Sequence, residues 1–167
     1  MLYNLSNETW KALFRAFFHF VSLQQRFFPC TDLKSMAGNL LIIDNLDTDY
    51  PLVRESLREY EEYSLLITDG IIMDFSELPD GAKIQRILTV YQLIRSIVDG
   101  PNTPYIILAR SDIVNSWPYQ DLDNLYDSMR MKTFYSGCDI IFMVVGGRLI
   151  FRNMLHGEVY GEEYAQY

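Results

Sequence analysis

The sequence is poor in the residues that bind soft metals and form disulfides. Its 167 residues include two cysteines, Cys30 and Cys138, and two histidines, His19 and His156. Neither cysteine has a CxxC neighbour, so the spacing indicates neither a zinc module nor a disulfide framework. We therefore expect a reduced, cytoplasmic protein.

Positive charge and long apolar runs are also scarce. The 14 Lys and Arg residues are outnumbered by 22 Asp and Glu residues, which gives a formal net charge of -8. Because non-specific nucleic-acid binding depends on cationic side chains, we expect no direct nucleic-acid contact. No run approaches the roughly 18 apolar residues of a membrane span, and no basic region precedes an apolar stretch at the N-terminus. We expect neither membrane association nor secretion.

Several motifs that carry chemistry are missing. The chain contains no GxxxxGK[ST], no GxGxxG that opens a helix after a strand, and no GxSxG, so it predicts no familiar nucleotide or hydrolase site. The runs LLIIDNLD, IIMDF and IILARS are similar in outline to the receiver domains of response regulators. The spacing between Asp44 and Asp74 is too short for the helix, strand and helix of that family, and no lysine follows the last run. The resemblance therefore implies no activity for this chain.

The composition that remains is that of a folded protein. Apolar residues make up 49% and aromatic residues 14% of the chain, and 167 residues suit one domain with its own core. The order of the periodic segments is helix, strand, helix, two strands, helix, strand, helix, two strands. This order predicts a single α/β domain whose mixed β-sheet has parallel core strands flanked by helices.

The N-terminal region predicts an amphipathic helix over residues 6–26, within an N-terminal part at 1–29 that packs on the domain. Its apolar stripe follows helical spacing and is unusually aromatic: Trp10, Leu13, Phe14, Phe17, Phe18 and Val21. Packing against the core is the simpler role for this stripe. The alternative is an exposed stripe that binds a partner or drives self-association, and self-association would make the protein a structural, self-assembling subunit.

The middle of the chain predicts alternating strands and helices. A buried strand is expected at 40–44, a helix from Pro51 to about Tyr63, and either a hairpin with Asp69-Gly70 as its turn or a bulged strand over 64–75. A helix is expected to follow Gly81 and end near 98, with these residues on its inner face: Ile84, Ile87, Leu88, Tyr91, Ile94 and Val98.

The last part predicts a strand, a helix and a hairpin. The strand lies at 103–110, and a polar helix at about 119–131 directs Leu122, Leu125, Tyr126 and Met129 inward. Gly146-Gly147 predicts a C-terminal β-hairpin within 139–155. An acidic, tyrosine-rich tail at 156–167 completes the chain.

The aspartates that follow predicted strands are the first candidate site. Asp44, Asp47 and Asp74 could converge on Mg²⁺ in a phosphoryl-transfer or hydrolytic enzyme. Each also has a local role in ending a strand or capping a helix. We favour the local roles and keep the magnesium enzyme as the alternative.

The second candidate site is a surface that combines negative charge with tyrosine. Three aspartates lie on one predicted helix and three glutamates in the tail, and tyrosines are interleaved with both: Asp121, Asp123, Asp127, Tyr119, Tyr126, Glu158, Glu162 and Glu163. Aromatic anchors with complementary charge are typical of protein interfaces. The leading hypothesis is an inhibitor or immunity-type factor that needs no cofactor and covers a basic, nucleic-acid-binding surface of another protein.

Overall fold

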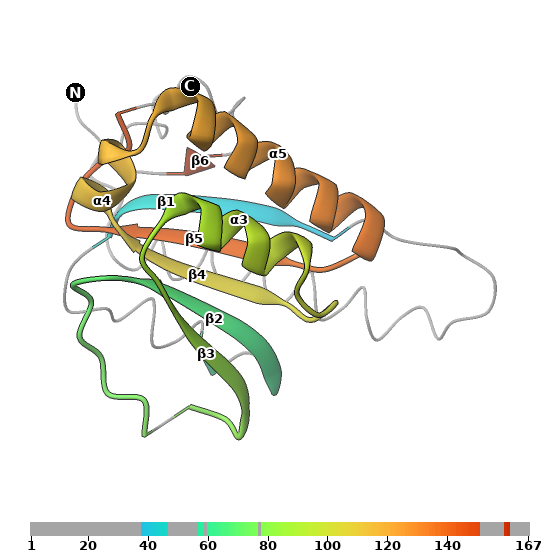
Figure 1. The fold of residues 1–167 in the computed structure, drawn as a ribbon. Coiled ribbons are helices and arrows are strands. Elements are labelled where there is room, and N and C mark those ends of the chain that lie inside the picture. The colour runs from blue at the N-terminus through green and yellow to red at the C-terminus, as the bar shows by residue number, and fades with distance from the viewer. Residues whose placement is uncertain (1–37, 47–56, 59, 77, 151–158, 161–167) are drawn as a thin grey trace, which may run out of the picture.

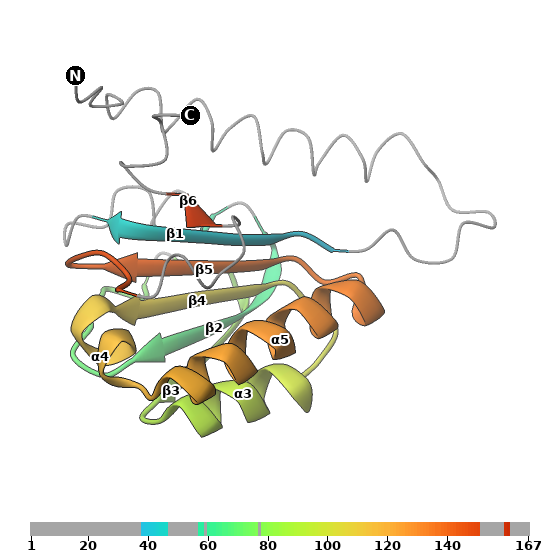
Figure 2. The ribbon, with the colours of Figure 1, turned by 90° about the horizontal axis from the view of Figure 1, so that it is seen from above.

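The computed structural model describes residues 38–46, 57–58, 60–76 and 78–150 and the backbone of 159–160. Six strands form one sheet in the order β3-β2-β4-β5-β1-β6 (Figures 1 and 2). The strands are β1 (Leu40–Leu46), β2 (Glu62–Thr68), β3 (Gly81–Ile87), β4 (Tyr105–Arg110), β5 (Ile140–Val145) and β6 (Val159–Tyr160). The helices are α3 (Val90–Val98), α4 (Ser111–Ser116) and α5 (Tyr119–Ser136). The structure therefore confirms the α/β class.

Every strand pair in the described part of the chain is parallel. The predicted mixed sheet is therefore wrong for these strands. Parallel strands that are covered on both faces read as continuous apolar runs, and β5 (IIFMVV) is buried at all six positions.

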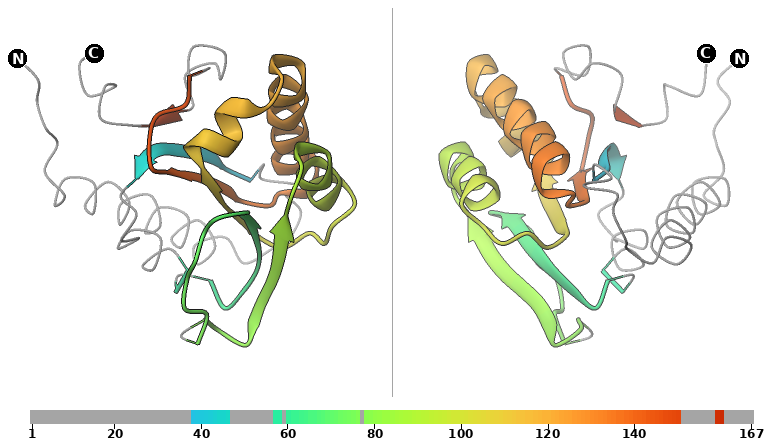
Figure 3. Two further views of the ribbon diagram at one scale, coloured as in Figure 1. Left: turned by 60° about the vertical axis from the view of Figure 1, so that its left-hand side comes forward. Right: turned by 90° about the vertical axis from the view of Figure 1, so that its right-hand side faces the viewer.

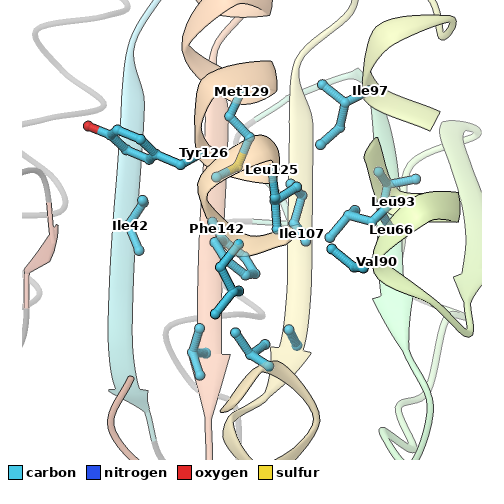
Figure 4. Packing of buried hydrophobic residues seen from close by; sticks show 14 of the residues in the cluster. Ile42, Leu66, Val90, Leu93, Ile97, Ile107, Leu125, Tyr126, Met129 and Phe142 are labelled. Atoms are coloured by element: carbon cyan, nitrogen blue, oxygen red, sulfur yellow. The ribbon is translucent and has the colours of Figure 1, made fainter. Parts of the chain in front are cut away.

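The two faces of the sheet have separate apolar cores. The core on the helix face joins side chains of α3, α4 and α5 to alternate residues of the strands, including Ile42, Ile107 and Phe142. Figure 4 shows Leu125 and Met129 of α5 and Val90, Leu93 and Ile97 of α3 directed toward the strands. The other alternate residues, such as Ile43, Ile106 and Met143, belong to the core of the second face.

The predicted hairpin at Asp69-Gly70 is wrong. Gly70 does adopt a positive φ of 76°, but the chain then runs without regular structure to β3, which pairs with β2 in parallel. Both edges of β2 are occupied by parallel neighbours, β3 and β4, so no edge remains for an antiparallel arm at 71–75. The run instead places Ile71 in the core of the second face.

The predicted helix after Gly81 is correct only in its second half. Residues Gly81–Ile87 form the edge strand β3, and α3 begins at Val90. The buried side chains of α3 are Val90, Leu93 and Ile97, whereas the expected inner residues Leu88, Tyr91 and Val98 are exposed. The helix is therefore shorter than predicted and presents a different face to the core.

Two side-chain caps mark the true start of α3, whose N-cap is Thr89. The Thr89 side chain accepts a hydrogen bond from the backbone N–H of Gln92 at 3.2 Å, and Gln92 Oε1 accepts one from the backbone N–H of Leu88 at 2.8 Å. Thr89 and Gln92 have the spacing T-x-x-Q that is typical of a helix start. This signal was present in the sequence and would have placed the boundary.

The other predicted elements have different outcomes. Helix α5 is confirmed with Leu122, Leu125, Tyr126 and Met129 buried, and it continues to Ser136, where Gly137 ends it at φ 65°. The first half of the helix expected from Pro51, residues 51–56, lies outside the described residues, and its expected end is wrong because β2 begins at Glu62. The N-terminal helix and most of the second arm of the C-terminal hairpin also lie outside the described residues.

Candidate partner-binding surface

Helix α5 has one buried and one exposed side. The buried residues face α3 and the sheet, while Asp123 and Asp127, one helical turn apart, are exposed. Tyr119, at the start of the helix, is 52% exposed. The surface predicted from the sequence therefore exists in part, with two aspartates and one tyrosine accessible.

Two of the predicted contact residues are internal instead. Asp121 is buried, and its carboxylate accepts a hydrogen bond from the hydroxyl of Tyr91, which lies 3.1 Å from both carboxylate oxygens. This bond raises the pKa of Tyr91 above its ordinary value of 10.0. Tyr126 is 1% exposed. Its ring belongs to the core on the helix face, where Arg130 lies 5.7 Å from its centroid.

The predicted tail residues lie outside the described part of the chain. For Glu158, Glu162 and Glu163 a role in binding stays a prediction.

Large apolar side chains are exposed on the C-terminal half of the same helix. Met131 is 56%, Phe134 63% and Tyr135 70% exposed, and the rings of Phe134 and Tyr135 pack edge to face with centroids 5.0 Å apart. Helical spacing places Met131 and Phe134 in line with Asp127. The apolar periodicity of the sequence predicts a helix only to about residue 131, so it gives no signal for Phe134 and Tyr135 as surface residues of α5. We call Asp123, Asp127, Met131, Phe134 and Tyr135 the α5 outer face.

A groove of about 690 Å³ adjoins the α5 outer face. It lies between the C-terminal half of α5 and the chain entering β1, and the residues that line it are Gly38, Leu40, Asp127, Arg130, Met131, Thr133, Phe134 and Tyr135. The backbone N–H of Gly38 donates to the carbonyl of Thr133 at 2.8 Å, which fixes the two walls against each other. The groove can accept an apolar side chain beside the Asp127 carboxylate.

A second groove, of about 580 Å³, lies between α3 and the edge strand β3. Its two cations are exposed and paired, Lys83 with Glu62 at 3.3 Å and Arg95 with Asp99 at 3.4 Å. Its other lining residues are mixed, with Ser64, Gln85, Gln92 and Ser96 beside the apolar Leu66, Ile84 and Pro101. With its charges balanced internally, this groove shows no preference for a charged ligand.

Two members of the predicted aspartate site, Asp44 and Asp74, lie in the described residues, and each accepts a hydrogen bond from a backbone N–H. Asp44 is 3% exposed, and its Oδ2 accepts a hydrogen bond from the backbone N–H of Leu149 at 2.9 Å. Asp74 is exposed in the β2–β3 connection and accepts from the backbone N–H of Ser76 at 2.9 Å, as in a local turn. Asp47 lies outside the described residues. Within the described ranges no three His, Cys, Asp or Glu side chains group to hold a metal.

The carboxyl end of the sheet, where ligands of open α/β sheets usually bind, is held by internal contacts. Asn45 donates its backbone N–H to the carbonyl of Gly147 at 3.0 Å, and Asn115 bonds the backbone of Arg148 and Ile150, both at 2.9 Å. Arg110 donates from Nε to Oδ1 of Asp112 at 3.0 Å. Hydrogen bonds thus hold loop 146–150 against β1 and α4. Asp44, which the sequence placed in a candidate magnesium site, accepts one of these bonds from the backbone N–H of Leu149.

Cys138 does not have the environment of a nucleophile. Its thiol is buried, and burial raises its pKa. A raised pKa lowers the thiolate fraction, and the thiolate is the reactive form. Cys30 lies outside the described residues.

Comparisons with known proteins give no family. A scan of the chain against family models finds no match, and a search of curated proteins finds no similar sequence. Among the helices of the described ranges, none has the length and apolar character required to cross a membrane. The function is therefore inferred from the surface of the described residues.

Proposed function

We propose that the protein acts by binding another protein through the α5 outer face. The observation that carries the proposal is the placement of two exposed carboxylates and three exposed large apolar side chains on one side of one helix. Surface patches of this kind, apolar and rimmed by charge, mark interaction sites more often than scattered single residues do.

The chemistry of the patch defines the partner. The aromatic rings of Phe134 and Tyr135 supply contact area at a low cost in conformational entropy, as interface anchors do. Asp123 and Asp127, on a chain of net charge -8, attract a basic surface and raise the rate of association. We propose a basic protein, such as one whose cationic face binds nucleic acid, and a role as its inhibitor or immunity-type factor in the cytoplasm.

The contact residues that we propose differ from those predicted from the sequence alone. Tyr119 remains a candidate at the edge of the patch, and the tail glutamates remain candidates outside the described residues. Asp121 and Tyr126 support α5 from inside and are not proposed as contacts. No feature of the described residues favours the magnesium-enzyme alternative.

The decisive experiment is capture of partners from the native cells by the tagged protein at two salt concentrations. We expect one stoichiometric basic protein whose capture is weakened by salt, because exposed charges are screened. Asp123→Lys with Asp127→Lys, and separately Phe134→Ser, should each abolish capture while the thermal unfolding midpoint stays close to that of the parent.

The controls match these variants in chemistry but lie elsewhere. Asp69→Lys with Asp80→Lys changes the charge equally at two exposed aspartates, and Ile72→Ser removes an apolar side chain that is 88% exposed. All should retain capture. Capture that survives both α5 variants, or that is lost equally in the controls, would reject the α5 outer face as the binding surface.

A further inference from the structure

One margin of the sheet has a backbone edge to which no described strand is paired. Strands β3 and β6 are the outermost strands in the described ranges, and β3 has seven residues, all paired with β2 on its inner side. Figure 3 shows β3 at this margin, with α3 above it. Successive residues of a strand direct their N–H and C=O groups to opposite edges, so about half of the groups of β3 point outward, where an added strand can bind them.

The features that usually protect an edge strand are weak in β3. Proteins protect such edges with proline, bulges or charged side chains. The sequence GAKIQRI has no proline, and its register with β2 runs through seven consecutive pairs without a shift. Its two cations are held over the sheet, because Lys83 donates to Oε1 of Glu62 on β2 at 3.3 Å and Arg86 donates to the carbonyl of Ile71 at 2.9 Å. Both cations therefore have partners on the inner side of β3.

Helix α3 leaves this strand accessible. The groove of about 580 Å³ lies between α3 and β3, and Ser96 donates from Oγ to Oε1 of Gln85 at 3.1 Å. Four consecutive residues of the strand, 83–86, are exposed. Ile84, at the middle of the strand, is a large apolar side chain that is 44% exposed. A β-branched residue in this position is well suited to pack against a facing residue of an added strand.

We propose that a second copy of the chain pairs with this edge, β3 against β3 in antiparallel orientation, about a two-fold axis through Ile84. A two-fold axis perpendicular to the sheet makes the two strands antiparallel, and two-fold dimers are the commonest oligomers. The pairing joins the two sheets and removes the open edge of each copy. Ile84 then lies opposite Ile84 of the second copy, with Cβ atoms about 4.5–5.5 Å apart.

The sequence of β3 favours this register. Outward-pointing backbone groups must meet outward-pointing groups, so the axis passes through a residue and not between two residues. This condition excludes the register that would set Lys83 against Arg86. An axis through Lys83 would place two lysines opposite each other, which destabilises a strand pair. An axis through Ile84 pairs all seven residues, sets Lys83 against Gln85 and opposes no like charges. The strand is therefore complementary to itself, which favours a second copy over an unrelated segment.

The proposed dimer responds to salt differently from partner binding at the α5 outer face. Each copy has a net charge of -8, so repulsion between the copies opposes the dimer, and salt should strengthen the dimer by screening this repulsion. Salt should instead weaken capture of a basic partner by the α5 outer face. A single strand pair is a small interface, so we expect a dimer that dissociates on dilution.

Sedimentation equilibrium of the full chain measures the dimer. We expect a reversible monomer–dimer equilibrium between micromolar and millimolar concentrations. Ile84→Lys and Ile84→Glu each place like charges opposite each other across the axis, and each should raise the dissociation constant of the dimer about tenfold or more. An equal mixture of these two variants brings opposite charges together and should restore dimerisation. Native mass spectrometry identifies the mixed dimer by its mass.

The controls make the same changes at an exposed isoleucine outside β3. Ile150 is 73% exposed, and Ile150→Lys and Ile150→Glu should leave the dissociation constant unchanged. Thermal unfolding midpoints close to that of the parent check that all four variants fold. Hydrogen exchange of the parent needs no variant, and amides of residues 81–87 should become more protected as the protein concentration rises.

Three results would overturn the proposal. The first is a parent that stays monomeric at millimolar concentration, and the second is an Ile84 variant that dimerises as strongly as the parent. The third is a mixture of the two Ile84 variants that does not recover dimerisation. Capture of a different protein by a monomeric parent, lost in Ile84→Lys, would assign the edge to a segment of that protein and would also overturn the pairing of two copies.

Discussion

The hydroxyl of Tyr91 lies 3.1 Å from both carboxylate oxygens of Asp121 and joins the first turn of α3 to the first turn of α5. The aspartates of α5 therefore fall into two groups, one buried and one exposed. One aspartate of the sequence-predicted cluster holds two helices together, while its neighbours Asp123 and Asp127 face outward. Whether a carboxylate of α5 is buried or exposed thus depends on the side chains packed beside it.

The Tyr91–Asp121 bond predicts a dependence of stability on pH. The bond raises the pKa of Tyr91 above 10.0, so its contribution is fully present below pH 10 and is lost as the pH rises through the higher pKa of the folded state. The thermal midpoint of Tyr91→Phe should therefore lie slightly below that of the parent at pH 7–9, and the difference should shrink above pH 10. Parallel melting curves from pH 7 to 11 measure this, and a difference that grows with pH would contradict the assignment.

Lys132 is a buried cation that connects α5 to the loop before β4. Its Nζ donates to the carbonyl of Gly100 at 2.9 Å and lies 5.8 Å from the centroid of the Tyr105 ring. Lys132→Met keeps the apolar stem but leaves the carbonyl without this donor, so we expect a loss of about 1–2 kcal/mol in the free energy of unfolding. Lys132→Ala also removes the packing of the stem and should cost about 2–4 kcal/mol.

Urea denaturation of the parent and both Lys132 variants gives these values. The ranking, with alanine worse than methionine, is the sharper part of the prediction. An unchanged midpoint in Lys132→Ala would show that the contact contributes nothing to stability.

Gly38 and Gly146 require glycine for two different reasons, close packing at Gly38 and a positive φ at Gly146. A Cβ at Gly38 would lie 2.0 Å from the backbone oxygen of Cys138, so Gly38→Ala must separate the chain entering β1 from the chain entering β5. At Gly146 a Cβ meets only Ser111 Oγ at 3.9 Å, but φ is +82°, so Gly146→Ala costs about 1 kcal/mol of backbone strain.

We expect Gly38→Ala to be the more destabilising variant by at least about 2 kcal/mol, measured by chemical denaturation. The reverse order would mean that the backbone at Gly38 moves without cost.

Asp44 is predicted to stabilise the fold and not to bind magnesium. Removing the acceptor for the backbone N–H of Leu149 in Asp44→Ala should cost about 1–3 kcal/mol, and Asp44→Asn, which keeps an acceptor oxygen, should cost less. Millimolar Mg²⁺ should leave the thermal midpoint of the parent unchanged. A rise in the midpoint with Mg²⁺ that is absent in Asp44→Asn would restore the enzyme hypothesis, because a ligand that binds the native state stabilises it.

The sequence by itself determined the class of the fold and the elements with strong local signals. Continuous apolar runs identified β1, β4 and β5, and the 3.6-residue period of 119–131 gave α5 with its correct buried face. Local capping chemistry at Thr89 and Gln92 also indicates the start of α3, although the apolar residues Ile84 and Ile87 extend the helical pattern toward Gly81.

Only the tertiary structure decided pairing direction, strand order and exposure. Asp69-Gly70 is a turn in either case, but whether a hairpin follows depends on which strands already occupy the edges of β2, and that is set by residues distant in sequence. Likewise Asp121 and Asp123 are chemically identical and two positions apart, and one is buried because Tyr91 of another helix lies beside it. Contacts between residues distant in sequence determine pairing direction, strand order and exposure. The pattern of apolar and polar residues along the chain does not say which segments lie next to each other, so it cannot predict these three properties.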